Sequence, residues 1–471
     1  METRLRKNGL SYIESMGLSV AIMAPTAAMA LNGSLAAGTV GVSVPLTYLL
    51  AMITIGLVSY AFVTFNKYYS SSGSVYAFTG AALGPKMGFL SGWTLLLTYL
   101  AFTGASVAEI GVFLQSFLAF LGVSISWFPL AVVGLVLVGI LTFLDVRVSA
   151  RVMVIFEGIS VALILILAVV ILGRGGSSGH LSPLPFSLGG NKMSSIGLGT
   201  VFAFLSFAGF EAASSLGEET ANPRRAIPLS IMTAVFVTGV FYIVVSYAQS
   251  VGFGLDAGGI KAFAGSGAPL GDLAGKFMSS GFAAAIMFGA TMSAFSSALG
   301  SATAGSRLLY AMGRDGLIHP ALGRVHNRFR SPWVALGVVV AVSFITIAVL
   351  ATQSGVSVFG YLGTIGVLAL LLAYLVTNVG AIYHFAKAKV WRGGFLIIPV
   401  IAILGLGYTL YSNVFPVPPM PYTLFPYIVI LWILIGLAIV LASPQMVRTI
   451  SERLRQESNV NVSSTSSQLE S

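Results

Sequence analysis

The chain has 471 residues, of which 56% are hydrophobic and only 8% are charged. A water-soluble chain carries about a quarter charged residues, so the composition disfavours soluble enzymes, nucleic-acid binders and disordered scaffolds. The formal net charge of +10 does not by itself indicate a nucleic-acid partner, and the absence of cysteine excludes disulfides, zinc knuckles and thiol catalysis. The sequence therefore predicts a polytopic membrane protein that lies in the lipid bilayer.

Helices that cross a bilayer need ~20 mostly apolar residues each. Twelve stretches meet this requirement and predict an all-α integral membrane protein. In chain order, the expected spans cover residues 11–36, 42–65, 87–120, 127–144, 149–172, 195–216, 227–253, 280–310, 332–352, 356–383, 395–411 and 424–442.

The basic residues predict how these spans are oriented, because lysine and arginine concentrate in cytoplasmic loops. With residues 1–10 in the cytoplasm, only four of the 24 basic residues fall outside, namely Arg174, Lys192, Lys261 and Lys276. The even number of spans places the tail, 443–471, in the cytoplasm as well, and its polar, serine-rich composition predicts disorder. We expect a multi-pass protein of the cell membrane, and this topology explains the positive charge without nucleic acid.

The spans fall into two groups of five. Residues 11–172 hold spans one to five, residues 195–383 hold spans six to ten, and two further helices follow in 395–442. Because five is odd, the second group must enter the membrane from the opposite side, which predicts an inverted repeat. Each group has its longest connection before its third member, at 66–86 and at 254–279.

Interruptions stand at corresponding places in the first helix of each group. The first span is interrupted at 24–28, around Pro25, and again at Asn32-Gly33, and the sixth span is interrupted at 206–211. Lipid cannot satisfy the backbone groups that a broken helix frees, so a matched pair of broken helices indicates the substrate site of an inverted-repeat transporter. Ordinary kinks are the alternative for either interruption taken alone.

The backbone groups freed at these interruptions suit a zwitterion. Pro25 fits the first position of a restarting helix, so the amides of Thr26, Ala27 and Ala28 would offer a carboxylate site at the positive end of the helix dipole. Gly209 would let a substrate approach the main chain of the second break. Carbonyls that precede the breaks would suit an ammonium, and they belong to Ile22, Met23, Phe204 and Leu205.

Four acidic residues fall within the predicted spans, where an unpaired carboxylate is costly. Glu109 stands ~33 Å along its helix, so we expect it at the outer edge of the membrane, reaching water. Glu14 stands at the cytoplasmic mouth of the first span, where it is hydrated or serves in a gate. Glu157 is ~12 Å deep, where it pairs with a basic loop residue or relays protons.

Glu211 follows the interruption in the sixth span, ~24 Å from the outer end. No lysine or arginine lies in the interior of any predicted span. Carboxyl groups that gain and lose a proton inside the membrane form the proton relays of transporters, so we assign proton coupling to Glu211, with Glu157 as a second candidate. A protonated glutamate that only bonds the freed backbone is the alternative for Glu211.

Two motifs resemble the amino acid–polyamine–organocation permeases. Residues 202–228, FAFLSFAGFEAASSLGEETANPRRAIP, resemble the aromatic-rich, glycine-broken sixth helix of that family and its Glu-Glu-x-x-Asn-Pro-x-Arg-x-Ile-Pro signature, which begins at Glu218-Glu219. Residues 306–320, SRLLYAMGRDGLIHP, are similar to the end of the eighth helix and the cytoplasmic loop after it. The resemblance extends over residues 11 to 442.

The resemblance implies a leucine-transporter-like, five-plus-five inverted-repeat fold with two added helices, and secondary transport of an amino acid or related amine. It implies a carboxylate site at 24–28, ammonium-binding carbonyls near Ile22 and Leu205, and a helix break at Ala208 and Gly209. It relates Glu211 to a glutamate implicated in the proton dependence of some members. The aromatic gate and the pocket face of the third helix correspond to Phe204, Phe207, Phe210, Thr98, Tyr99 and Thr103.

Two departures from the family pattern bear on the substrate and the coupling ion. Cation-selective members have Leu-Glu-Tyr on the third helix, where this chain has Leu97-Thr98-Tyr99, which argues against arginine or lysine as the main substrate. Several proton-coupled members have a lysine on the fifth helix, whereas the aligned place here is about Ser160. Sodium could then bind carbonyls of the first span and hydroxyls of the eighth, those of Ser293, Ser296 or Ser297.

We therefore predict a permease that imports neutral L-amino acids by alternating access, coupled to protons or, as the alternative, to sodium. An amino acid exchanger and a polyamine importer stay open within the same class. A transporter-derived nutrient sensor is the alternative from another class. We expect neither a cofactor nor an enzyme, because the spans contain no histidine metal cluster, no paired catalytic carboxylates and no base beside their serines.

Overall fold

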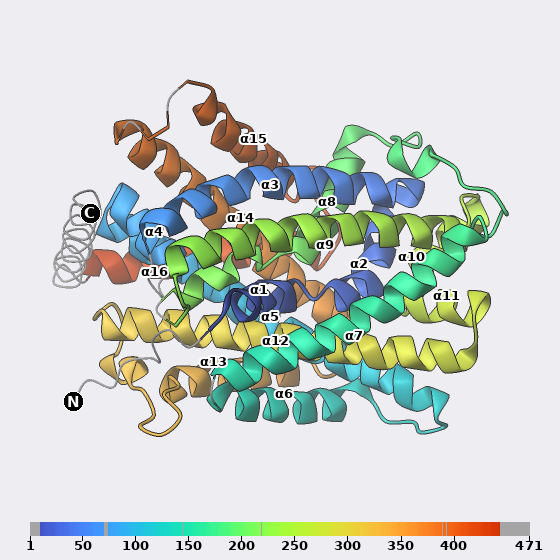
Figure 1. Ribbon diagram of the computed structural model, residues 1–471, viewed down its shortest axis with the longest axis horizontal. Coiled ribbons are helices and arrows are strands. Elements are labelled where there is room, and N and C mark those ends of the chain that lie inside the picture. The colour runs from blue at the N-terminus through green and yellow to red at the C-terminus, as the bar shows by residue number, and fades with distance from the viewer. Residues whose placement is uncertain are drawn as a thin grey trace.

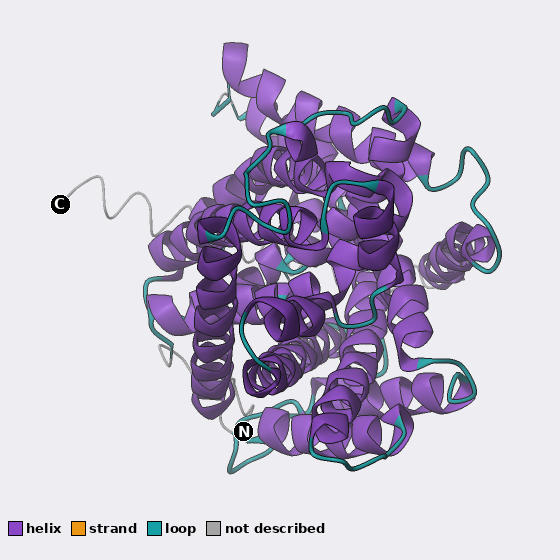
Figure 2. Ribbon diagram, turned by 90° about the vertical axis from the view of Figure 1, so that its right-hand side faces the viewer, coloured by secondary structure: helices purple, strands orange, loops and turns teal. Residues whose placement is uncertain are grey.

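The computed structural model of the chain describes residues 10–69, 74–144, 146–217, 219–388, 390–391 and 393–442. Residues 1–9 of the predicted N-terminal segment, the predicted tail and Glu218 of the signature lie outside these ranges. Within the described residues the fold is built from helices, and the β-type pairing found there is a single parallel bridge between Leu10 and Thr220. Figure 2 shows the helices and the loops that join them.

The described ranges contain sixteen α-helices, which are, in chain order, α1 (Tyr12–Met23), α2 (Pro25–Val40), α3 (Val44–Tyr68), α4 (Val75–Leu83), α5 (Pro85–Phe120), α6 (Trp127–Phe143), α7 (Val146–Gly173), α8 (Met193–Phe207), α9 (Pro223–Phe253), α10 (Ala257–Gly265), α11 (Pro269–Phe277), α12 (Ser280–Arg314), α13 (Trp333–Val349), α14 (Gly355–Lys387), α15 (Ile397–Ser412) and α16 (Phe425–Ala442). Short 3₁₀ segments connect several of them. One of these, η3 (Phe210–Leu216), is separated from the end of α8 by two residues.

The long helices run side by side along the longest axis of the molecule (Figure 1). α5 packs against both α12 and α14, and α3 packs against α9. The short helices α10 and α11 lie together at the right-hand end of the view in Figure 1. α1, α2 and α8 lie among these long helices, so the interrupted segments are enclosed by the rest of the bundle.

By length and composition, nine helical stretches of the described chain are long and apolar enough to cross a membrane. One of them is the run Tyr12–Tyr68, which contains α1, α2 and α3, and two further apolar helices, α6 and α13, have 17 residues each. Large apolar side chains face outward from the bundle, as Val169, Leu404 and Leu431 do, with 69%, 66% and 59% of their surface exposed. Such an apolar exterior suits lipid as the surrounding solvent.

Two of the three interruptions predicted from the sequence are present, and each has a local backbone cause. α1 ends at Met23, Ala24 adopts a left-handed conformation with φ of 40°, and Pro25 starts α2 at its first position. Proline is tolerated there because its missing amide would have no helical partner. α8 ends at Phe207, and Gly209 follows with φ of +96°, which only glycine adopts without strain.

The interruption expected at Asn32-Gly33 is not present, because α2 continues through both residues to Val40. Asn32 donates a hydrogen bond from Nδ2 to Ser206 Oγ (2.9 Å), which ties α2 to α8. A Cβ at Gly33 would stand 2.5 Å from Oε1 of Gln249, whose Nε2 donates to the Met29 carbonyl (2.6 Å). The glycine therefore makes room for a side chain of α9 and does not break the helix.

Candidate functional site

The two interruptions lie directly against each other in the structure. The hydroxyl of Tyr242 lies within hydrogen-bond distance of the carbonyls of Met23 (2.9 Å) and Ser206 (2.6 Å), one beside each break, and its single hydrogen is shared between them. Ser19 Oγ donates to the Phe210 carbonyl (2.6 Å), which links α1 directly to η3. These bonds satisfy backbone groups that the breaks would otherwise leave unpaired in an apolar interior.

The amides at the start of α2 have partners within the protein. The Thr26 amide donates to Glu157 Oε1 (3.2 Å), and the Ala27 amide donates to Ser293 Oγ (3.1 Å). The Ala28 amide bonds the Ala24 carbonyl (2.8 Å). The positive end of α2, which the sequence assigned to a substrate carboxylate, therefore holds the carboxyl group of Glu157, as expected for an anion at a helix N-terminus.

The carbonyls expected to hold a substrate ammonium are also in use. Ile22 accepts a hydrogen bond from Ser297 Oγ (3.0 Å), and the Leu205 carbonyl accepts one from the Ala208 amide (3.3 Å). A carbonyl oxygen has two lone pairs, so each of them can accept one more donor.

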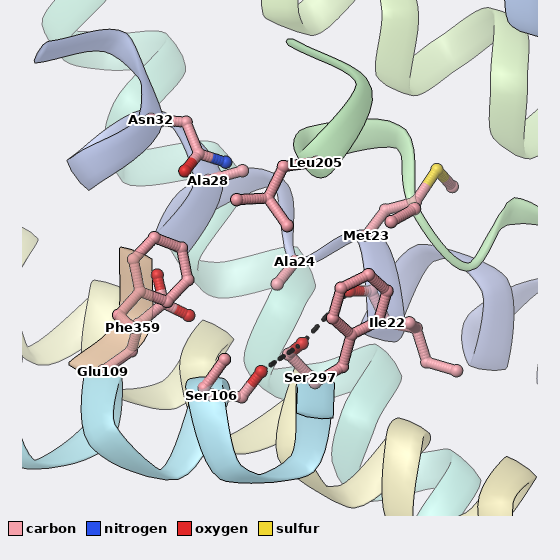
Figure 3. Close-up of a pocket in the computed structure, with 13 residues that line it drawn as sticks. Ile22, Met23, Ala24, Ala28, Asn32, Ser106, Glu109, Leu205, Ser297 and Phe359 are labelled. Atoms are coloured by element: carbon pink, nitrogen blue, oxygen red, sulfur yellow. Dashed lines mark hydrogen bonds between the residues drawn. The ribbon is translucent and has the colours of Figure 1, made fainter. Parts of the chain in front are cut away.

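A small buried cavity of about 30 Å³ lies between the two breaks (Figure 3). A space of this size holds water molecules but no amino acid, so the cavity is too small for such a substrate in this conformation. Residues that the sequence assigned to substrate or ion binding form part of the wall: Ile22, Ala24, Ala28, Leu205, Ala208 and Ser297. Met23, whose carbonyl was considered for an ammonium, is also in the wall. The other residues of the wall were not assigned from the sequence: Asn32, Phe102, Ala105, Ser106, Glu109 and Phe359.

Other residues assigned from the sequence lie around the cavity without lining it. Thr98 Oγ1 donates to the Gly366 carbonyl (3.1 Å), and Thr103 Oγ1 donates to the Tyr99 carbonyl one turn earlier on α5 (2.7 Å). The Phe207 ring packs edge-on against Tyr242, with 5.0 Å between centroids. Phe204 is buried, and so are the residues of η3, Phe210–Leu216.

The three serines considered for a sodium site point in different directions. Ser293 Oγ donates to Glu157 Oε1 (3.0 Å), and Ser297 Oγ donates to the Ile22 carbonyl, so both contact the region of the first break. Ser296 Oγ instead donates to the Met292 carbonyl of its own helix (3.0 Å). Ser160, at the aligned place of the family's lysine, donates to the Gly289 carbonyl (2.8 Å) and joins α7 to α12.

Glu211 is fully buried just after the second break, in η3. The hydroxyl of Tyr99 donates to Oε1 (2.9 Å), and the hydroxyl of Tyr374 donates to Oε2. The rings of Phe62 and Phe210 pack against Tyr374, with centroids 5.3 and 5.0 Å away. Glu211 therefore lies in an aromatic pocket between α5, α14 and η3 and is separate from the cavity wall.

Glu157 lies at the start of α2 and not beside a basic loop residue. Its Oε1 accepts hydrogen bonds from the Thr26 amide and the Ser293 hydroxyl, while Oε2 is buried without a partner. Of the two roles left open from the sequence, the pairing with a basic residue is absent among the described residues. The carboxyl instead connects α7 to the first break.

The position of Glu109 differs most from the depth in the membrane that was expected from the sequence. It was expected to reach water at the membrane edge, but only 3% of its surface is exposed and it lines the cavity. α5 has 36 residues and is therefore ~54 Å long, well beyond the ~30 Å of a hydrocarbon core. Counting from the start of the helix thus misplaced Glu109, and the excess length of α5 was the signal that could have corrected it.

The loop after η3 carries part of the predicted signature and is held by a buried ion pair. Arg307 Nε lies 2.6 Å from Glu219 Oε1, and the two side chains are 4% and 2% exposed. A second bond joins Arg307 Nη2 to Glu219 Oε2 (3.3 Å). The pair therefore fixes the segment between η3 and α9 against α12.

We predict that Glu219→Gln lowers the free energy of unfolding by about 3–5 kcal/mol, because it leaves Arg307 buried without its counter-charge. The measurement is the thermal unfolding midpoint of the purified protein in detergent. Glu14→Gln is the matched control, because the Glu14–Arg151 pair (3.3 Å) leaves Arg151 69% exposed and such a pair contributes about 0–1 kcal/mol. Equal midpoints for the two variants would contradict the prediction.

The comparison with known proteins agrees with this architecture. The profile of the amino acid permease family matches residues 16–449, nearly the whole chain. The chain belongs to this family. As a member of the amino acid–polyamine–organocation superfamily with many apolar helices, this permease is a multi-pass membrane transporter.

Named relatives of the permease are transporters for different solutes. The methylthioribose transporter of Bacillus subtilis is 26% identical over 454 residues, covering 91% of each chain. The branched-chain amino acid permease BcaP of the same organism is 28% identical and covers 70% of this chain and 72% of its own. The low-affinity putrescine importer PlaP of Escherichia coli is 27% identical, with 73% and 75% covered. The relatives therefore agree on transport and differ in substrate.

Proposed function

We propose that this permease is a secondary active transporter that imports an amino acid or a related amine by alternating access, driven by an inward proton gradient. The observation that carries the proposal is the meeting of two interrupted segments, α1–α2 and α8–η3, at a buried cavity with carboxyl and hydroxyl groups in its wall. Irregular backbone at membrane depth is tolerated only where protein buries it or where it lines a cavity. In transporters such breaks form the substrate site.

We propose the twelve-span topology in the cell membrane, with both termini cytoplasmic and inverted repeats in 11–172 and 195–383. The pairing of helices supports the repeat. Corresponding members of the two groups pack together: α3 with α9, α5 with α12, and α6 with α13. The fifth member of each group also packs on the third member of the other group: α7 packs on α12, and α14 packs on α5. Short helices also precede the third member of each group, α4 before α5 and α11 before α12.

The proposed substrates are small solutes with a free amino group. Thr98, which replaces the glutamate implied for cation-selective members, supports neutral L-amino acids. Glu109 supports amines as a second candidate, because it brings a carboxyl into the cavity from the same helix. A branched-chain amino acid permease and a putrescine importer are both among the relatives, in keeping with either class.

Glu211 is the proposed proton-coupling residue. Hydroxyl groups can donate to a carboxylate and accept from a carboxylic acid, so Tyr99 and Tyr374 can serve both protonation states of Glu211. Sodium is the alternative ion, bound near Glu157 by the hydroxyls of Ser293 and Ser297.

Uptake by the purified permease in liposomes tests the proposal. We expect at least one member of a panel of radiolabelled amino acids and amines to accumulate above equilibrium when an inward proton gradient is imposed. Collapse of the gradient with a protonophore should abolish that accumulation. Accumulation under a sodium gradient alone would contradict the proton coupling. Movement that always requires a second substrate on the opposite side would instead identify an exchanger, and no movement of any panel member would favour a sensor.

A further inference from the structure

We infer that Glu109 forms a cation-binding subsite in the cavity, so that this site selects its substrate for a free ammonium group and does not recognise a carboxylate. The inference rests on the proposed function, and it goes further by naming the charge that the site requires and the residue that supplies it. Three observations carry it: an unpaired buried carboxyl, a wall whose hydroxyl groups have already donated their hydrogens, and an occupied anion site.

Glu109 is buried in the cavity wall with its Oε1 unpartnered. Among the described residues, the ion pairs involve other acids, namely Glu14, Glu219 and Asp315. Figure 3 shows Glu109 beside Phe359 on the side of the cavity opposite Met23. A buried carboxyl without donor or counter-charge is costly, and a bound ammonium would supply both at once.

The hydroxyl groups of the wall have already donated their hydrogens. Ser106 Oγ donates to Ser297 Oγ (2.8 Å), and Ser297 Oγ donates in turn to the Ile22 carbonyl (3.0 Å). Asn32 uses one of its two Nδ2 hydrogens for Ser206, and its Oδ1 is buried without a partner. Apart from the second Nδ2 hydrogen of Asn32, the side chains of the wall offer acceptor oxygens, above all Glu109 Oε1 and Asn32 Oδ1. An ammonium with three N–H donors complements such oxygens and a carboxylate does not.

The site that would hold a substrate carboxylate is filled by the protein. Pro25 has no amide, and the amides of Thr26 and Ala27 donate to Glu157 and Ser293. Neither Thr26 nor Ala27 lines the cavity. A substrate carboxylate would have to displace the Glu157 carboxyl from the start of α2, and a second anion placed beside it would be repelled. The cavity therefore favours a substrate that has lost its carboxylate.

Equilibrium binding to the purified full-length permease tests the subsite with two ligand pairs that differ only by a carboxylate, putrescine with ornithine and 3-methylbutylamine with leucine. We expect each amine to bind more tightly than its amino acid partner. Glu109→Gln should weaken amine binding ~10- to 100-fold, the effect of losing a hydrogen bond between charged groups. Glu109→Asp keeps the charge and should restore most of the affinity, while Glu14→Gln, outside the cavity, should leave it unchanged.

The outcomes separate this inference from the proposed transport. Tighter binding of ornithine and leucine than of the two amines would overturn the subsite, and so would amine binding that is indifferent to Glu109→Gln. Proton-driven uptake of leucine that is unaffected by Glu109→Gln would overturn the subsite and leave the transport proposal standing. Amine binding that depends on Glu109, without gradient-driven uptake of any solute, would support the subsite and refute the transport proposal.

Discussion

Replacing Gly209 with valine is expected to abolish uptake, with a loss of about 100-fold or more, the scale on which small displacements in a reacting or binding site act. Gly209 has φ of +96°, and a Cβ added there would stand 2.7 Å from Cβ of Ile22. The substitution would therefore strain the second break and push it away from the first. Because the cavity lies between the two breaks, its shape would change directly.

Liposome uptake measured beside a folding control decides the result. Gly56→Val on α3 is the matched control, because no atom lies within 4 Å of the place its Cβ would take. Both variants should elute as the wild type does in size-exclusion chromatography. If the valine variant does not fold, Gly209→Ala makes the same contact with Ile22 through one methyl group and replaces it. Wild-type uptake by a folded Gly209 variant would refute the placement of the site.

The local sequence was enough to predict where the helices break. Pro25 lacks an amide and Gly209 adopts a positive φ, so both breaks are properties of a few adjacent residues. The same reasoning failed at Asn32-Gly33, because Gly33 makes room for the side chain of Gln249, a residue of another helix. A helix break can be inferred from residue type. In the sequence, however, a glycine that makes room for a neighbouring side chain cannot be told from a glycine that breaks a helix.

The partners of the freed amides could not be predicted, because they come from distant parts of the chain. Glu157 is 131 residues from Thr26, and Ser293 is 266 residues from Ala27. The burial of Glu211 was predicted from its depth, but its contacts with Tyr99 and Tyr374 depend on how three helices pack. Glu109 was misplaced for a geometric reason, since the length of α5 makes the distance along the helix a poor measure of depth.

Glu211→Gln is expected to remove the proton dependence of uptake while leaving exchange intact. Under the proposed coupling, a lower external pH would protonate the outward-facing carboxyl of Glu211, and a higher internal pH would deprotonate it after the site has turned inward. Uptake should therefore rise as external pH falls at constant internal pH. Glutamine keeps the size of the side chain and can accept a hydrogen bond from Tyr99 or Tyr374, but it does not titrate.

Two assays on the same liposomes separate coupling from folding. Uptake across a range of external pH should be flat in Glu211→Gln, without accumulation above equilibrium. Counterflow, in which unlabelled substrate inside exchanges for labelled substrate outside, needs no net proton movement and should persist. Glu157→Gln is the comparison: a flat profile in that variant beside a normal one in Glu211→Gln would transfer the coupling role to the carboxyl at the start of α2. Sodium-driven uptake that is indifferent to pH in the wild type and in Glu211→Gln would refute proton coupling at either residue.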